Sequence, residues 1–295
     1  SCRVACMAQV EVCVDSVASA VAAVEGGARR VEVAAALAVG GVTASAAVVA
    51  AVAREVARRR CGTEAFVLLR CRPGHFVYSE HEIAVMQDDA RLFAANPDVA
   101  GLVVGALRPD GAVDHAALRL LLSAGDEARA AAALPPLSWT FHRAIDVSRD
   151  PVESVLELVR QHKRITRVLT SGAAPSAWEG RDTIRRMVAA AAAAAEQAGD
   201  RSEPNEAFAV MAGGGLKPEL AAALVRYTAV SQLHGSFARA EASPMLLPPG
   251  CSMASAASAA SSTDAASRAS EYDVMVADAE LVRRCVQEAN TAISS

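Results

Sequence analysis

The sequence has few of the features that mark membrane proteins or nucleic-acid-binding proteins. Its formal net charge is -4 and its isoelectric point is near 5.9, so no overall positive charge attracts nucleic acid or an anionic membrane surface. No uninterrupted run of about 18 strongly apolar residues is present to span a bilayer. The first seven residues contain no apolar segment of signal-peptide length. We therefore expect neither nucleic acid nor membrane as a partner.

The sequence also lacks the cysteine spacing of a disulfide-stapled or zinc-binding domain. Its seven cysteines are an odd number and include no CxxC pair. A chain of 295 residues has ample material for an apolar core and does not need disulfides for stability. Reduced thiols, and with them a cytoplasmic location, fit this pattern better.

Strand-like and helix-like segments alternate along the chain. The strands are expected at residues 8–14, 29–35, 65–71, 99–105, 138–142, 166–170, 208–211 and 230–234. Each is followed by a helical segment, the one after the fourth strand being expected at about 114–123, and a last helix is expected at about 272–288. Parallel neighbours require crossover connections of this kind, and a count of eight favours a closed barrel over an open sheet. The sequence predicts an α/β fold, a (β/α)8 TIM-type barrel in a single domain.

The expected domain organisation is one barrel with few additions. Residues 1–7 form an N-terminal extension, and residues 8–288 form the barrel. Two stretches of low complexity, 189–207 and 250–270, interrupt the rhythm as insertions or loops. Neither stretch carries residues with evident chemistry.

Polar side chains recur on one face of several expected strands. In the segment from Ser138 to His142, Trp139 and Phe141 point to one side of the sheet, whereas Thr140 and His142 point to the other. Active sites of barrels lie at the carboxyl ends of the strands. The residues that we expect at that mouth are Glu11, Glu32, Arg70, Arg72, His142 and His234, and Cys13 shares the strand face of Glu11. A self-neutralising network that only fills the barrel is one interpretation, and a ligand site with mutually tuned pKa values is the favoured one.

The loops after the strands add candidate anion-binding groups. Gly214 and Gly215 follow the seventh strand and Ser236 follows the eighth, where many barrels bind phosphate with backbone N–H groups. A tight turn would explain these glycines equally well. Further candidates in the loops after the fifth and sixth strands are Arg143, Asp146 and Ser171.

Seven blocks in this order resemble the CutC copper homeostasis family over about residues 8–288. They are Val10–Ser16, Arg30–Val33, Gly40–Thr43, Arg70–Ser79, Thr140–Asp146, Arg167–Gly172 and Met211–Gly215. The resemblance implies a TIM-type barrel, a cytoplasmic setting, a homodimer, and a role in binding copper and controlling its intracellular level. It also implies copper as the bound metal, whereas the carboxylates and histidines of the mouth, taken by themselves, also suit a harder divalent metal.

The chain departs from the family pattern at two places. The family often has a second cysteine two residues after Glu32, where this chain has Ala34. Cu(I) prefers two or more soft ligands, so the missing thiol weakens a direct copper site. The family commonly shows Arg-Pro-Arg-Gly-Gly-Asp where this chain has Arg70–His75, which places an imidazole where a carboxylate is expected.

Two functional hypotheses remain open at this point. In the first, the protein handles copper, with Cys13, His142 and His234 as candidate metal ligands. In the second, it is a barrel enzyme of the lyase, isomerase or hydrolase type that acts on a small anionic substrate, with or without a phosphate group. Glu11, Glu32 and the same two histidines would then be the acid–base or metal-binding groups, and the arginines and loop residues would bind the anion.

Overall fold

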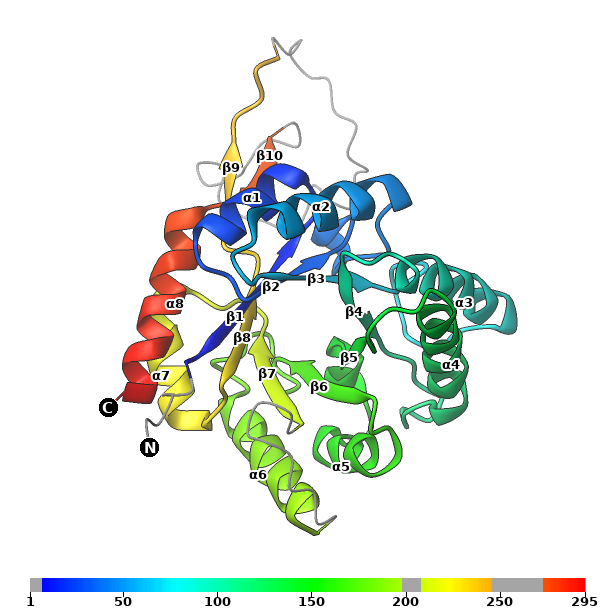
Figure 1. Cartoon of the computed structure of the whole chain (residues 1–295). Helices are drawn as coiled ribbons and strands as arrows, with labels where there is room; N and C mark the ends of the chain where they lie inside the picture. Colours follow the sequence, from blue (N-terminus) through cyan, green and yellow to red (C-terminus); the bar gives the residue numbers. More distant parts are fainter. Residues whose placement is uncertain (1–6, 198–207, 246–272, 295) are drawn as a thin grey trace, which may run out of the picture.

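The computed structural model describes residues 7–197, 208–245 and 273–294, and Figure 1 shows their arrangement. The strands are β1 (Gln9–Val14), β2 (Arg30–Val33), β3 (Glu64–Leu68), β4 (Val99–Val104), β5 (Ser138–Phe141), β6 (Ile165–Thr170), β7 (Ala209–Gly213), β8 (Gln232–Gly235), β9 (Ala238–Glu241) and β10 (Val274–Ala277). The helices are α1 (Val17–Glu25), α2 (Ala46–Arg59), α3 (Glu80–Ala94), α4 (His115–Ala131), α5 (Pro151–Gln161), α6 (Arg181–Gln197), α7 (Pro218–Thr228) and α8 (Ala279–Ser294). Two short 3-10 helices, η1 (Leu37–Val39) and η2 (Arg143–Val147), lie in loops.

The predicted (β/α)8 barrel is confirmed. Strands β1 to β8 pair in sequence order, all in parallel, and β8 pairs with β1 to close the barrel. The closing register aligns Glu11 with Arg30 on one side and with His234 on the other. Polar residues that lie far apart in sequence are thereby placed at one level of the barrel interior.

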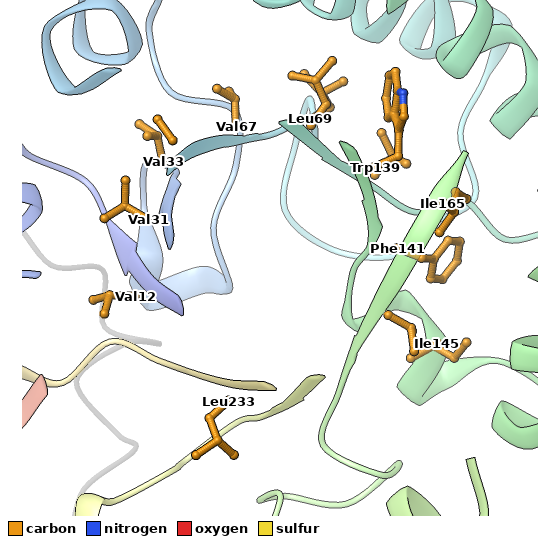
Figure 2. Packing of buried hydrophobic residues seen from close by; sticks show 14 of the residues in the cluster. Val12, Val31, Val33, Val67, Leu69, Trp139, Phe141, Ile145, Ile165 and Leu233 are labelled. Carbon is orange, nitrogen blue, oxygen red and sulfur yellow. The ribbon is translucent and has the colours of Figure 1, made fainter. Parts of the chain in front are cut away.

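The outer faces of the strands are apolar and contact the surrounding helices. Val12, Val33, Trp139, Phe141 and Leu233 are fully buried. Figure 2 shows them on the outside of the barrel, each directed away from its centre. Successive side chains of a strand point to opposite faces of the sheet. Because the apolar residues face the helices, the polar residues that alternate with them face the barrel interior.

Short polar side chains fix the points where the helices begin. Ser16, Ser45 and Ser79 accept hydrogen bonds from backbone N–H groups in the first turns of α1, α2 and α3, and Asp114 and Asp150 do the same for α4 and α5. Each cap satisfies N–H groups that the helix itself leaves free. Ser16 follows β1 almost directly, whereas longer loops on the side of the candidate site separate the other four caps from the strands before them.

The structure differs from the sequence prediction in three elements. The third strand ends at Leu68 rather than at Cys71, so the residues beyond it leave the alternation of the sheet. The last helix begins at Ala279, after the Asp278 cap, because Val274–Ala277 pair with β9 in an antiparallel two-stranded sheet. Helix α4 runs to Ala131 rather than to Ser123. Residues 1–6, 198–207 and 250–270 of the expected extension and insertions lie outside the described residues, and 189–197 continue α6.

Within the described part of the chain, no helix is both long enough and apolar enough to cross a membrane.

The packing of α4 on β5 predicts that a glycine-to-alanine change within the helix destabilises the protein, which is the opposite of the usual effect. Replacing a helical glycine by alanine normally stabilises by about 1 kcal/mol. A Cβ atom at Gly125, however, would lie 2.7 Å from the ring of Trp139, which is fully buried and has no room to move. We expect Gly125→Ala to lower the free energy of unfolding by about 1–3 kcal/mol in urea denaturation. Ser123→Ala, on the exposed side of α4, should change it by less than about 0.5 kcal/mol, and a stabilised Gly125→Ala would contradict the packing.

Candidate functional site

A cavity of about 330 Å³ opens at the carboxyl ends of the barrel strands. A volume of this size suits a small metabolite. Most of the residues predicted for the mouth line it: Cys13, Glu32, Arg70, His142, Arg143, Gly214, Gly215, His234 and Ser236. Glu11, Arg72, Asp146 and Ser171 do not, and each of these four has a different position.

Glu11 lies below the cavity, where it pairs with two cationic side chains. It is fully buried, and its carboxylate accepts a hydrogen bond from Arg30 Nε at 2.8 Å and lies 2.9 Å from His234 Nδ1. Burial alone would raise the pKa of Glu11, but the hydrogen bond with His234 and the charge of Arg30 hold it at about 2. A buried carboxylate with two partners is ionised throughout the physiological range, so Glu11 orients the site and does not exchange protons.

His234 connects this buried pair to the cavity. Burial disfavours its charged form, but hydrogen bonds to Cys13 and Glu11 outweigh that effect and raise the pKa of His234 well above its usual value. Its second ring nitrogen, Nε2, lies 3.7 Å from Glu32. The raised pKa favours the charged form of His234, which lines the cavity.

Glu32 has the opposite response to burial. It has no cationic partner as close as those of Glu11, so desolvation dominates and raises its pKa to about 7, despite the opposing charge of His234. The negative charge of Glu11 adds to the increase. A carboxyl group that titrates near neutral pH and lines a cavity can both accept and donate a proton, which is the property required of a general acid–base residue.

His142 remains neutral at the end of β5. Its Nδ1 accepts a hydrogen bond from the backbone N–H of Ala144 at 3.1 Å, at the start of η2. Burial and the nearby charge of Arg70 lower its pKa to about 3. Gly105 makes this position possible, because a Cβ atom there would lie 2.3 Å from the imidazole.

Arg143 lies in the loop after β5, where two side chains fix its guanidinium. Its Nε donates to Asp146 at 2.8 Å, and a terminal nitrogen donates to the Ser171 hydroxyl at 2.8 Å. Asp146 also accepts hydrogen bonds from the Thr170 hydroxyl and from the backbone N–H of Ser171. Asp146 and Ser171 thus position the guanidinium from behind and do not line the cavity. The guanidinium itself lies against Gly214, whose φ of +104° brings bare backbone to the cavity edge.

The two arginines after β3 point to different places, which corrects the expectation that both face the mouth. Arg70 lines the cavity, and its terminal nitrogens donate to the carbonyls of Gly41 and Gly74 at 2.8 Å. Arg72 pairs with Glu82 of α3 and lies over the Tyr78 ring. The prediction failed because it extended strand alternation beyond Leu68, where β3 ends.

Two interior arginines were missed by the sequence reasoning. Arg30 binds Glu11 and also donates to Gln9 and Gln232 at the lower end of the barrel. Arg167 lies over the Phe66 ring, and burial together with the charge of Arg30 lowers its pKa to about 10. Arg30 could have been found, because it lies two positions before Glu32 and therefore on the same strand face.

The donor set of the cavity does not fit a Cu(I) site with two thiolates. Cys13 is the one thiol among the residues that line the cavity, and Ala34 occupies the wall beside it. Both nitrogens of His234 face carboxylates. Among the described residues, no group of three or more His, Cys, Asp or Glu side chains could hold a metal ion.

The titration of Glu32 can be observed directly. We expect side-chain carboxyl NMR resonances to include one with an apparent pKa near 7 that is absent in Glu32→Gln. Because the folded value exceeds the ordinary 4.5, ionisation of Glu32 removes stability as pH rises from about 4.5 to about 7. The natural chain should therefore lose stability over this pH range, whereas Glu32→Gln should not, so the free energy of unfolding of the variant rises relative to that of the natural chain. A Glu32 resonance that titrates below pH 5 would contradict the assignment.

Comparison with known proteins agrees with this architecture. The model of the CutC family matches residues 8–239. A CutC protein from Pasteurella multocida is 35% identical over 77% of this chain and 80% of its own, and one from Xylella fastidiosa is 43% identical over 63% of each. The solved structure of CutC from Streptococcus agalactiae is 27% identical and superposes with a TM-score of 0.65 over 78% of this chain and 99% of its own. The chain belongs to the CutC family.

Proposed function

We propose that the cavity binds a small organic anion and carries out proton transfer on it, with Glu32 as the acid–base residue. The observation that carries the proposal is the meeting of two kinds of group in one cavity. An anchored guanidinium, that of Arg143, lies at one edge, and a carboxyl group with a pKa near 7 lies in the wall. Perturbed titratable groups in a cleft are typical of catalytic sites.

The charge around the cavity favours an anion over a bare cation. Three cationic side chains line the cavity: Arg70, Arg143 and protonated His234. The opposing negative charge is that of Glu32, which is only partly ionised at neutral pH. Arg143 has its Nε and one terminal nitrogen held by Asp146 and Ser171, so the entropy cost of fixing the side chain is met before a ligand arrives. Its other terminal nitrogen, close to Gly214, suits a phosphate or carboxylate oxygen.

The anion site can be tested with glycerol 3-phosphate by isothermal titration calorimetry. We expect Arg143→Ala to weaken binding at least about tenfold, since it removes a charge-assisted hydrogen bond. Arg149→Ala is the control, because Arg149 is an exposed arginine that pairs with Asp110 outside the cavity. Equal losses in the two variants would show that only general surface charge is involved and would contradict the proposal.

Copper handling is a second candidate function. The solved relative from Streptococcus agalactiae is named for a copper homeostasis role, and the Cys13 thiol lines the cavity here. Cu(I) would then be cargo, and one thiolate would hold it together with weaker donors. This candidate is less well supported, because Cu(I) sites usually contain at least two soft ligands and Ala34 supplies none.

Restoring the second thiol separates the two candidates. Residues 13 and 34 both line the cavity from neighbouring strands, so Ala34→Cys would offer Cu(I) two thiolates. With a competing Cu(I) chelator, we expect weak binding by the natural chain and at least about tenfold tighter binding by Ala34→Cys. Stoichiometric tight binding by the natural chain that is lost in Cys13→Ala would instead support copper as its cargo.

A further inference from the structure

The imidazole of His142 has an unused hydrogen-bond donor in the cavity wall. The residue is 5% exposed, and its Nε2 is buried without a hydrogen-bond partner among the described residues. Most buried polar atoms in proteins have a partner, so an exception in a ligand cavity requires an explanation. Neither the packing of the barrel nor the anion site at Arg143 provides one.

The protonation state of this imidazole is fixed by the backbone. Ala144 N–H can only donate, so Nδ1 of His142 must be the acceptor of their hydrogen bond. In the neutral ring, the single proton is therefore on Nε2. Triosephosphate isomerase provides a precedent. A helix N-terminus keeps its catalytic imidazole neutral, and this neutral imidazole donates a hydrogen bond to a substrate oxygen.

Arg70 places a positive charge in the wall of the same cavity, and this charge acts on the His142 imidazole by lowering its pKa. The guanidinium of Arg70 is 4.9 Å from the centre of the Phe76 ring, and the imidazole of His142 is 5.0 Å from it on a tilted ring contact. Backbone carbonyls of Gly41 and Gly74 hold Arg70 in place. A neutral donor next to a fixed cation stabilises an oxygen that gains negative charge, because neither group has to reorganise as the charge develops.

We propose that His142 Nε2–H, supported by the charge of Arg70, binds the carbonyl oxygen of the substrate and its enolate. The substrate would then be a small aldehyde, ketone or oxo acid with an anionic group. In the reaction, the Glu32 carboxylate takes a proton from the carbon next to the carbonyl. The electron pair of the broken C–H bond forms the enolate, whose oxygen accepts from His142, and return of the proton to the same carbon regenerates the substrate. Where that carbon carries a hydroxyl, the hydroxyl proton moves to the enolate oxygen and the Glu32 carboxyl delivers its proton to the former carbonyl carbon, which completes an isomerisation. This assignment rests on the proposed function and specifies its substrate class.

Enolate mimics test the assignment separately from the anion site. One pair of probes carries phosphate: phosphoglycolohydroxamate, a planar enediolate mimic, and glycerol 3-phosphate. A second pair lacks it: oxalate, which mimics the enolate of pyruvate, and glycolate. By calorimetry on the whole chain, we expect at least about tenfold preference for the mimic in one pair or both, the effect of one well-placed hydrogen bond to a charged group.

Variants and NMR spectroscopy identify the group responsible. The preference should fall to within about twofold in His142→Phe and should largely return in His142→Gln, which keeps a donor, whereas His75→Ala in the exposed loop should leave it unchanged. In the natural chain, the Nε2 proton of His142 should move downfield when the mimic binds, a readout that does not depend on any variant folding. No preference in either pair, or a preference unchanged in His142→Phe with a static Nε2 resonance, would overturn the assignment. Tight binding of glycerol 3-phosphate without preference would leave the anion site standing and refute only the carbonyl subsite.

Discussion

The buried carboxylate of Glu11 is the constraint on which the polar interior depends. It pairs with Arg30 on one neighbouring strand and His234 on the other. An unpaired charge at this depth would cost several kcal/mol, so the three groups must be present together. Closure of the barrel brings them together, since the β1–β8 pairing aligns Glu11 with His234. The fold and the chemistry of the mouth are therefore linked through one residue.

The different environments of Glu11 and Glu32 explain how two similar carboxyl groups acquire different properties. Glu11 has two close cationic partners, and its pKa falls to about 2. Glu32 is also buried, but its nearest cation is His234 at 3.7 Å, and its pKa rises to about 7. One carboxylate supports the site while the other can exchange protons. Pairs of titratable groups whose environments separate their pKa values are a common basis for acid–base assignment.

Strand periodicity was sufficient to predict much of this site. Alternation places Glu11, Glu32 and His234 on inward faces, and the count of eight strands implies that these faces meet. It failed for Arg72, because β3 ends at Leu68 and the chain beyond follows loop geometry. The supporting role of Asp146 depends on contacts with the loop after β6, which no local pattern encodes. The β9–β10 pair joins segments that are separated by more than 30 residues, and a helical interpretation of 272–288 missed it.

Equilibrium unfolding of Glu11→Gln shows whether the Glu11 network determines the properties of the mouth. Removing one partner leaves Arg30 and His234 as buried, uncompensated cations, which should lower the free energy of unfolding by about 3–5 kcal/mol at pH 7. Glu64→Gln, which breaks the exposed pair with Arg29, should lower it by less than about 1 kcal/mol. A loss in Glu11→Gln no larger than that in Glu64→Gln would contradict the account.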